Sequence, residues 1–134
     1  MDTETILKSY FSKQKEVLGV YLFGSVAKGK ENRFSDVDVA VLFDRSVPEA
    51  EYTDQQLAFM NGLSRLLNRD VDVVVLNKAT VFLRFQILRG DKRVYERPDR
   101  NERTFEARTL VEYLDFLPIR RRLEASLIRS IRGS

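Results

Sequence analysis

The chain carries a Gly24-Ser25 step that is followed, after ten further residues, by the motif Asp36-Val37-Asp38. The Gly-Ser step ends one apolar run, and the two aspartates open a second one. Because successive side chains of a strand point to opposite faces, Asp36 and Asp38 share one face of the second strand. Two carboxylates whose backbones are about 6.6 Å apart can bridge a pair of Mg²⁺ ions. The motif therefore predicts a metal site.

The Gly-Ser step predicts a phosphate-binding turn beside that metal site. A small-residue turn at the end of a strand lets backbone N–H groups and the Ser25 hydroxyl approach a phosphate closely. Ser25 would also serve as the N-cap of a short helix over residues 25–28, and a helix N-terminus favours negative charge. Lys28 follows closely enough to neutralise a bound triphosphate. We therefore expect Gly24, Ser25 and Lys28 to bind the nucleotide.

Asp72 is the natural third carboxylate, because it lies inside the apolar run from Val71 to Leu76. We expect this run to be a strand buried on both faces, where an aspartate is costly unless it is paired or binds a metal. Asp70 lies on the same face but falls in the preceding turn, where aspartate is common. We assign the third position to Asp72 and keep Asp70 as its competitor.

Composition narrows the chemistry that such a site can perform. The chain has no cysteine and no histidine, so a general base must be a carboxylate, a lysine, a tyrosine or water. The metal must be one that prefers oxygen ligands, such as Mg²⁺. The absence of cysteine, of a long apolar run and of a basic leader predicts a cytoplasmic protein without membrane contact. Residues 1–119 carry a net charge of −1, which argues against a nucleic-acid-binding face.

Hydrophobic periodicity predicts an α/β fold, with a small mixed β-sheet flanked by helices and a helical C-terminus. The expected strands cover residues 17–23, 37–43, 71–76 and 93–96. The expected helices cover residues 3–15, 51–67, 80–89 and 101–117, and Pro118 should end the last of them. The first two strands can be joined by an antiparallel return or by a short crossover. Four aromatic residues of the last helices should pack in the core or at an interface: Phe82, Phe85, Tyr113 and Phe116.

The length of 134 residues suggests one domain over residues 1–118, followed by a basic amphipathic segment over residues 119–134. This segment contains five arginines and one glutamate. Leu123, Leu127 and Ile131 would form an apolar stripe beside the arginines. Such a stripe suits either a partner helix or packing on the same domain, and both alternatives stay open.

Three stretches of the chain resemble the nucleotidyltransferase superfamily that includes DNA polymerase beta: Leu22-Phe23-Gly24-Ser25 with Ala27-Lys28-Gly29, Ser35-Asp36-Val37-Asp38, and Val71-Asp72-Val73. The small size is similar to the minimal nucleotidyltransferase (MNT) branch, known as antitoxins encoded beside HEPN ribonuclease toxins. The resemblance implies a polymerase beta-like nucleotidyltransferase fold over residues 1–118. The superfamily often has arginine where Lys28 stands, so the charge is kept but bidentate phosphate contact is lost.

The resemblance also implies an activity and a partner. Asp36 and Asp38 would hold two Mg²⁺ ions, Gly24 and Ser25 would bind the β- and γ-phosphates of ATP, and Asp72 would complete one metal site. AMP would then be transferred to a tyrosine hydroxyl of a cognate HEPN toxin, in a hetero-oligomer with that toxin. Two alternatives are a binding-only antitoxin that occludes its partner and an aminoglycoside-type small-molecule nucleotidyltransferase. A chain this short leaves little room for a small-molecule acceptor site.

Overall fold

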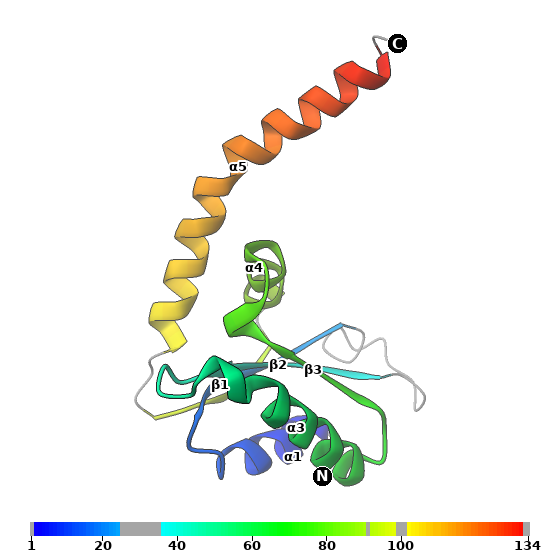
Figure 1. Cartoon of the computed structure of the whole chain (residues 1–134). Helices are drawn as coiled ribbons and strands as arrows, with labels where there is room; N and C mark the ends of the chain where they lie inside the picture. The colour runs from blue at the N-terminus through cyan, green and yellow to red at the C-terminus, as the bar shows by residue number, and fades with distance from the viewer. Residues whose placement is uncertain (1, 25–35, 91, 99–101, 133–134) are drawn as a thin grey trace.

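The computed structural model describes residues 2–24, 36–90, 92–98 and 102–132 of the chain (Figure 1). The elements follow in the order α1 (Thr3–Phe11), β1 (Val17–Phe23), β2 (Val37–Phe43), the 3-10 turn η1 (Glu49–Glu51), α3 (Tyr52–Leu67), β3 (Val71–Val75), the 3-10 turn η2 (Leu76–Lys78), α4 (Val81–Gly90), β4 (Arg93–Glu96) and α5 (Glu102–Arg132). None of the described helices is both long and apolar enough to cross a membrane.

The described strands form one mixed sheet in the order β3-β2-β1-β4. β1 pairs antiparallel with both β2 and β4, whereas β2 pairs parallel with β3. The predicted mixed sheet is therefore confirmed, and the connection between the first two strands is the antiparallel return. Because β2 and β3 are parallel, both strands begin at the same end of the sheet, next to the end of β1.

Helices cover both faces of this sheet, as Figure 1 shows. α1 and α3 pack on one face, where Leu7, Phe11, Phe59 and Leu63 join the odd-numbered residues of β2 in the main core. α4 covers the other face through Ile87, which packs with a second apolar cluster. This two-sided cover explains why β1 and β2 read as nearly continuous apolar runs, since both faces of a central strand lose contact with water.

The strand β3 differs from expectation, because only one of its faces is buried. Val71, Val73 and Val75 are buried under α3, whereas Asp72 is exposed and Val74 is half-buried. The prediction of a strand covered on both sides was wrong at this point. β3 is the edge of the sheet, and an apolar side chain such as Val74 does not reveal that its face is partly open. Burial is therefore no reason for giving Asp72 a role.

The helix α5 also differs from expectation, because it continues through Pro118 to Arg132. Proline removes one backbone hydrogen bond, to the carbonyl four residues earlier, at Leu114. Pro118 and Leu114 are both exposed, so water can hydrate that carbonyl. Strong helix formers continue on both sides of the proline. Figure 1 shows α5 bending along its length and extending beyond α4. A separate role for residues 119–134 stays a prediction.

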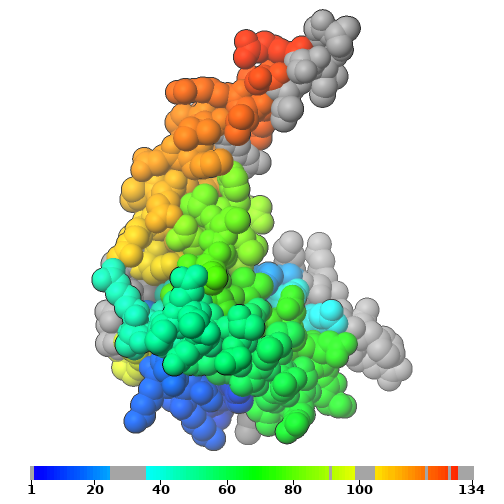
Figure 2. Space-filling model, in the orientation of Figure 1, coloured from blue at the N-terminus to red at the C-terminus, as the bar shows by residue number. Residues whose placement is uncertain are grey.

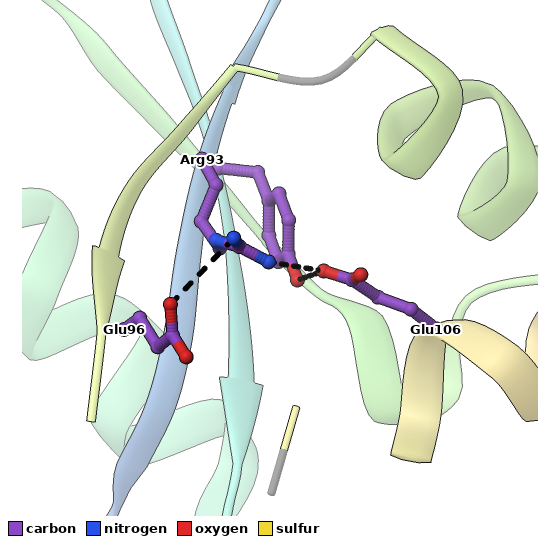
Figure 3. Close-up of polar contacts among 4 residues, drawn as sticks. Arg93, Glu96 and Glu106 are labelled. Atoms are coloured by element: carbon purple, nitrogen blue, oxygen red, sulfur yellow. Dashed lines mark hydrogen bonds and ion pairs between the residues drawn. The ribbon is translucent and has the colours of Figure 1, made fainter. Parts of the chain in front are cut away.

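The first half of α5 is fastened to α4 and to the sheet. Phe82 of α4 lies edge-on to Tyr113 and Phe116, and Phe85 stacks on Tyr113 with ring centroids 3.8 Å apart. The four aromatic residues thus pack between two helices, as expected. Glu106 of α5 adds polar contacts to the sheet, because its Oε1 accepts hydrogen bonds from the hydroxyl of the buried Tyr21 at 2.6 Å and from Arg93 Nη1 at 2.9 Å. Figure 3 shows Arg93 placed between Glu96 and Glu106.

We expect the substitution Tyr21→Phe to lower the free energy of unfolding by about 1–2 kcal/mol, because it removes a buried hydrogen bond to a carboxylate. Urea denaturation of both proteins measures the difference. Tyr113→Phe is the matched control, since no hydrogen bond of its hydroxyl is seen among the described residues, and it should unfold like the wild type. Equal losses of unfolding free energy in the two variants would show that the hydrogen bond from Tyr21 to Glu106 does not stabilise the fold.

Candidate active site at the start of β2 and β3

Gly24 lies directly after β1 and brings the backbone against a carboxylate. Its φ angle is +73°, which side-chain-bearing residues rarely adopt. A Cβ atom built on Gly24 would overlap Oδ2 of Asp38, so the Asp38 carboxylate or the turn would have to shift. The register of β1 and β2 explains this closeness, since Phe23 is the antiparallel partner of Asp38. A glycine at this position therefore permits the Asp38 carboxylate to sit against the turn.

Asp72 lies beside Asp38 on the neighbouring strand. The two residues are direct partners in the parallel register of β2 and β3, and adjacent strands are about 4.8 Å apart. Both side chains lie on the face of the sheet that also carries Ala40 and Leu42, opposite the face that packs on α1 and α3. Asp36 precedes β2 and is exposed. The structure therefore brings together Asp38 and Asp72, the two aspartates that sequence alone could not place side by side.

These carboxylates influence one another electrostatically. Burial raises the pKa of Asp38 above its ordinary value, and the negative charges of Asp72 and Asp36 raise it further. Such a shift means that the ionised form of Asp38 is disfavoured unless a positive charge is nearby. A bound cation would remove this penalty. A perturbed carboxyl group beside two further carboxylates is typical of catalytic and metal-binding sites.

The donor set fits a hard divalent cation, since every candidate ligand is a carboxylate oxygen. No group of three acidic side chains within residues 2–24, 36–90, 92–98 and 102–132 is positioned to hold a metal by itself. This arrangement suits Mg²⁺ in particular, because Mg²⁺ is usually held by one or two carboxylates together with water and the phosphates of the substrate. The carboxylates would thus provide part of the coordination and a nucleotide the rest.

Two of the expected nucleotide-binding residues, Ser25 and Lys28, lie outside the described residues, as does the short helix expected there. Gly24 is the described member of that set. Asp70 lies just before β3 and is exposed, and its backbone carbonyl accepts a hydrogen bond from the Val37 N–H at 2.9 Å. Asp72, and not Asp70, is the register partner of Asp38.

A cavity of about 520 Å³ lies at the other end of β2, and no sequence motif points to it. Its lining includes Phe43, Arg84, Phe105 and Arg108, from elements that are distant in the chain. Four of its polar side chains are engaged in ion pairs or hydrogen bonds. Arg84 pairs with Glu112 at 2.5 Å. Asp44 pairs with Arg97, and the Asn77 side chain forms hydrogen bonds with the backbone of Phe43. The end of the sheet that carries Asp38 and Asp72 therefore remains the better candidate for an active site.

A known protein family matches most of this chain. Residues 5–100 match the family described as "Polymerase beta, Nucleotidyltransferase". Over 94 residues the chain is 29% identical to the protein adenylyltransferase MntA of Shewanella oneidensis, and the alignment covers 70% of this chain and 64% of that protein. The chain thus spans less than two thirds of the length of this relative.

Solved structures confirm the predicted fold. One chain of a crystal structure of a toxin–antitoxin with AMP-PNP superposes with a TM-score of 0.77 at 23% identity, covering 95% of this chain and 99% of that one. One chain of a structure of the tri-AMPylated Shewanella oneidensis HEPN toxin in complex with MNT antitoxin gives a TM-score of 0.68 at 20% identity, covering 94% and 99%.

Proposed function

Because this chain belongs to the polymerase beta nucleotidyltransferase family, we propose that it transfers AMP from ATP to a hydroxyl group of a partner protein, in a Mg²⁺-dependent reaction. The observation that carries this proposal is the register of the parallel pair β2 and β3, which places Asp38 beside Asp72. Gly24 lies at the same end of the sheet, with its backbone against the Asp38 carboxylate. A nucleotide bound at this turn would place its phosphates next to the carboxylates.

In this proposal each residue has a separate task. Gly24 and Ser25 bind the β- and γ-phosphates through backbone N–H groups and a hydroxyl, and Lys28 neutralises phosphate charge. Asp36 and Asp38 would hold the metal ions when these are bound, and Asp72 would complete one of the two metal sites. Burial and the charges of Asp72 and Asp36 raise the pKa of Asp38 in the free protein, and bound cations would offset this effect.

The transfer is an in-line displacement at the α-phosphorus. When bound, Mg²⁺ polarises the phosphate and stabilises charge on the attacking and leaving oxygens. The oxygen of the acceptor hydroxyl forms a bond to the α-phosphorus, and the bond from that phosphorus to the pyrophosphate oxygen breaks. A carboxylate oxygen of Asp72 takes the hydroxyl proton, since the chain has no histidine to do so. The products are an AMP-modified partner and pyrophosphate.

We assign the acceptor to a tyrosine of a HEPN-type toxin, which the transfer would silence. The support is the relative named a protein adenylyltransferase, together with the fold shared with a complex that contains a tri-AMPylated HEPN toxin.

The proposal is tested by incubating the purified protein with Mg²⁺, α-labelled ATP and a HEPN-type protein from the adjacent reading frame. Label should move to the HEPN-type protein, and Asp36→Asn combined with Asp38→Asn should abolish this transfer. γ-labelled ATP is the control, because its label should leave with pyrophosphate. Label transfer that survives the double substitution would exclude the metal assignment. Neutralisation of the toxin without any transfer would favour an antitoxin that acts by binding alone.

A further inference from the structure

The cavity at the far end of β2 lies between the sheet, α4 and the first half of α5. β2 contributes Leu42 and Phe43 to its lining, α4 contributes Arg84, and α5 contributes Phe105 and Arg108. Figure 2 shows the first half of α5 lying against α4, next to the turn that follows β2. The volume of about 520 Å³ falls within the range of small-molecule sites, about 300–1,000 Å³. We call this space the arginine cavity.

The arginine cavity is separate from the candidate active site. Phe43 follows Asp38 by five residues on β2, which corresponds to about 17 Å along the strand. Ala40 lies between the two sites on this strand, and it belongs to the same buried cluster as Ile87 of α4. A ligand in the arginine cavity would therefore lie away from the carboxylates at the start of β2 and β3.

The positive charge of the arginine cavity exceeds its negative charge. The two acidic side chains of the lining are already paired, one with Arg84 and the other with Arg97. The remaining arginines of the lining, Arg45 and Arg108, are exposed, and neither forms an ion pair within the described part of the chain. Two positive charges are thus left without a partner at a concave surface, where they attract an anion.

Arg84 adds a hydrogen-bond donor to this charge. Its Nη2 pairs with Glu112, and its guanidinium carbon lies 5.6 Å from the centre of the Phe105 ring. Its Nε is buried and has no hydrogen-bond partner among the described residues. A buried donor is costly unless an acceptor reaches it. An oxygen atom of an anion bound in the cavity would be such an acceptor.

Aromatic side chains provide much of the apolar lining. Phe43 and Tyr52 stack with ring centroids 5.0 Å apart and ring planes 11° apart, and Phe105 joins them from α5. Aromatic side chains bind flat rings by stacking, and arginine binds phosphate through two parallel hydrogen bonds. A lining that combines both kinds of side chain therefore suits a ligand that carries a flat ring and a phosphate group.

We propose that the arginine cavity is a second ligand site, which binds a nucleoside monophosphate. A phosphate monoester carries a charge of about −1.5 to −2 at pH 7, which matches the two unpaired arginines. The phosphate would lie between Arg45 and Arg108, and the base would lie against the aromatic side chains. Binding here needs neither Mg²⁺ nor a partner protein, so the proposal can be tested independently of the proposed transfer of AMP.

Isothermal titration calorimetry of the full chain with AMP, GMP, CMP and UMP, each titrated separately in the presence of a chelator, tests this proposal. At least one of the four should bind, and more tightly than its own nucleoside or inorganic phosphate, because base and phosphate contact different parts of the lining. Arg45→Gln and Arg108→Gln should each weaken this binding about tenfold or more, since each removes a charged hydrogen-bond donor.

Arg89→Gln is the matched control. It removes an exposed arginine of α4 that is not part of the lining, and it should bind the nucleotide like the wild type. Circular dichroism checks that the three variants keep their helix content. Absence of binding for all four monophosphates would overturn the proposal. So would binding that Arg45→Gln and Arg108→Gln leave unchanged, binding that Arg89→Gln weakens equally, or inorganic phosphate that binds as tightly as the nucleotide.

Discussion

Replacing Asp38 with asparagine is expected to reduce AMP transfer at least about 100-fold and, in metal-free protein, to raise the melting temperature. Asparagine keeps the shape of the side chain but removes the negative charge that burial, Asp72 and Asp36 all disfavour. The protein would thus lose its activity and gain stability. Label transfer and thermal unfolding in the presence of a chelator measure the two effects.

The gain in stability should depend on pH. Because the pKa of Asp38 is raised, the folded protein binds a proton that the unfolded chain has already lost, so wild-type stability falls as the pH rises through this window. The asparagine variant lacks this loss. Its advantage should therefore be present at neutral pH and should shrink as the pH is lowered towards the ordinary carboxyl range. A variant with a lower melting temperature than the wild type at neutral pH would contradict this explanation.

Replacing Gly24 with alanine is expected to lower transfer by about 100-fold, because a catalytic carboxylate moved by about 1 Å loses roughly that much. The added methyl group overlaps Asp38 Oδ2, and the positive φ angle alone costs alanine about 1–2 kcal/mol. The protein should therefore also unfold more easily. Transfer rates and urea denaturation give both quantities.

Gly90→Ala is the matched control for this substitution. Gly90 ends α4, and an added Cβ would have no atom within 4 Å. Alanine should be tolerated there, with transfer close to that of the wild type and stability unchanged or slightly improved. If Gly24→Ala transferred AMP as well as Gly90→Ala does, the close approach of Asp38 to the turn would have no part in the reaction.

Local patterns sufficed to predict most of the elements. Two helices begin at polar side chains close in the chain, since Asp2 accepts a hydrogen bond from the Thr5 N–H and Thr80 accepts one from the Leu83 N–H. β4 was expected from four residues before a proline, and it forms an edge strand. These signals are local in the chain, so neighbouring residues alone are enough to determine them.

The order and direction of the strands depend on contacts between distant residues, which periodicity does not report. Asp72 was singled out because an aspartate in a buried strand is costly, yet it is exposed on an edge strand. What connects it to the site is its pairing with Asp38, and this pairing appears only once β2 and β3 are known to be parallel and in register. The residue was therefore selected for a reason that the structure replaces with a better one.

The length of α5 is a second feature that local sequence patterns did not predict. Proline in the interior of a helix usually kinks or breaks it, and Pro118 was expected to end the helix. The helix nevertheless continues, with Pro118 exposed. Whether a proline breaks a helix depends on the surroundings of one carbonyl, which belong to the tertiary structure.

The most direct test of the proposed site compares two aspartates that are two residues apart. Asp70 and Asp72 are both exposed and lie at the start of the same strand, but only Asp72 is the register partner of Asp38. AMP transfer from α-labelled ATP to the HEPN-type protein should be lost in Asp72→Asn and kept in Asp70→Asn. Transfer that survives in Asp72→Asn, or that is lost only in Asp70→Asn, would contradict a site built on Asp38 and Asp72.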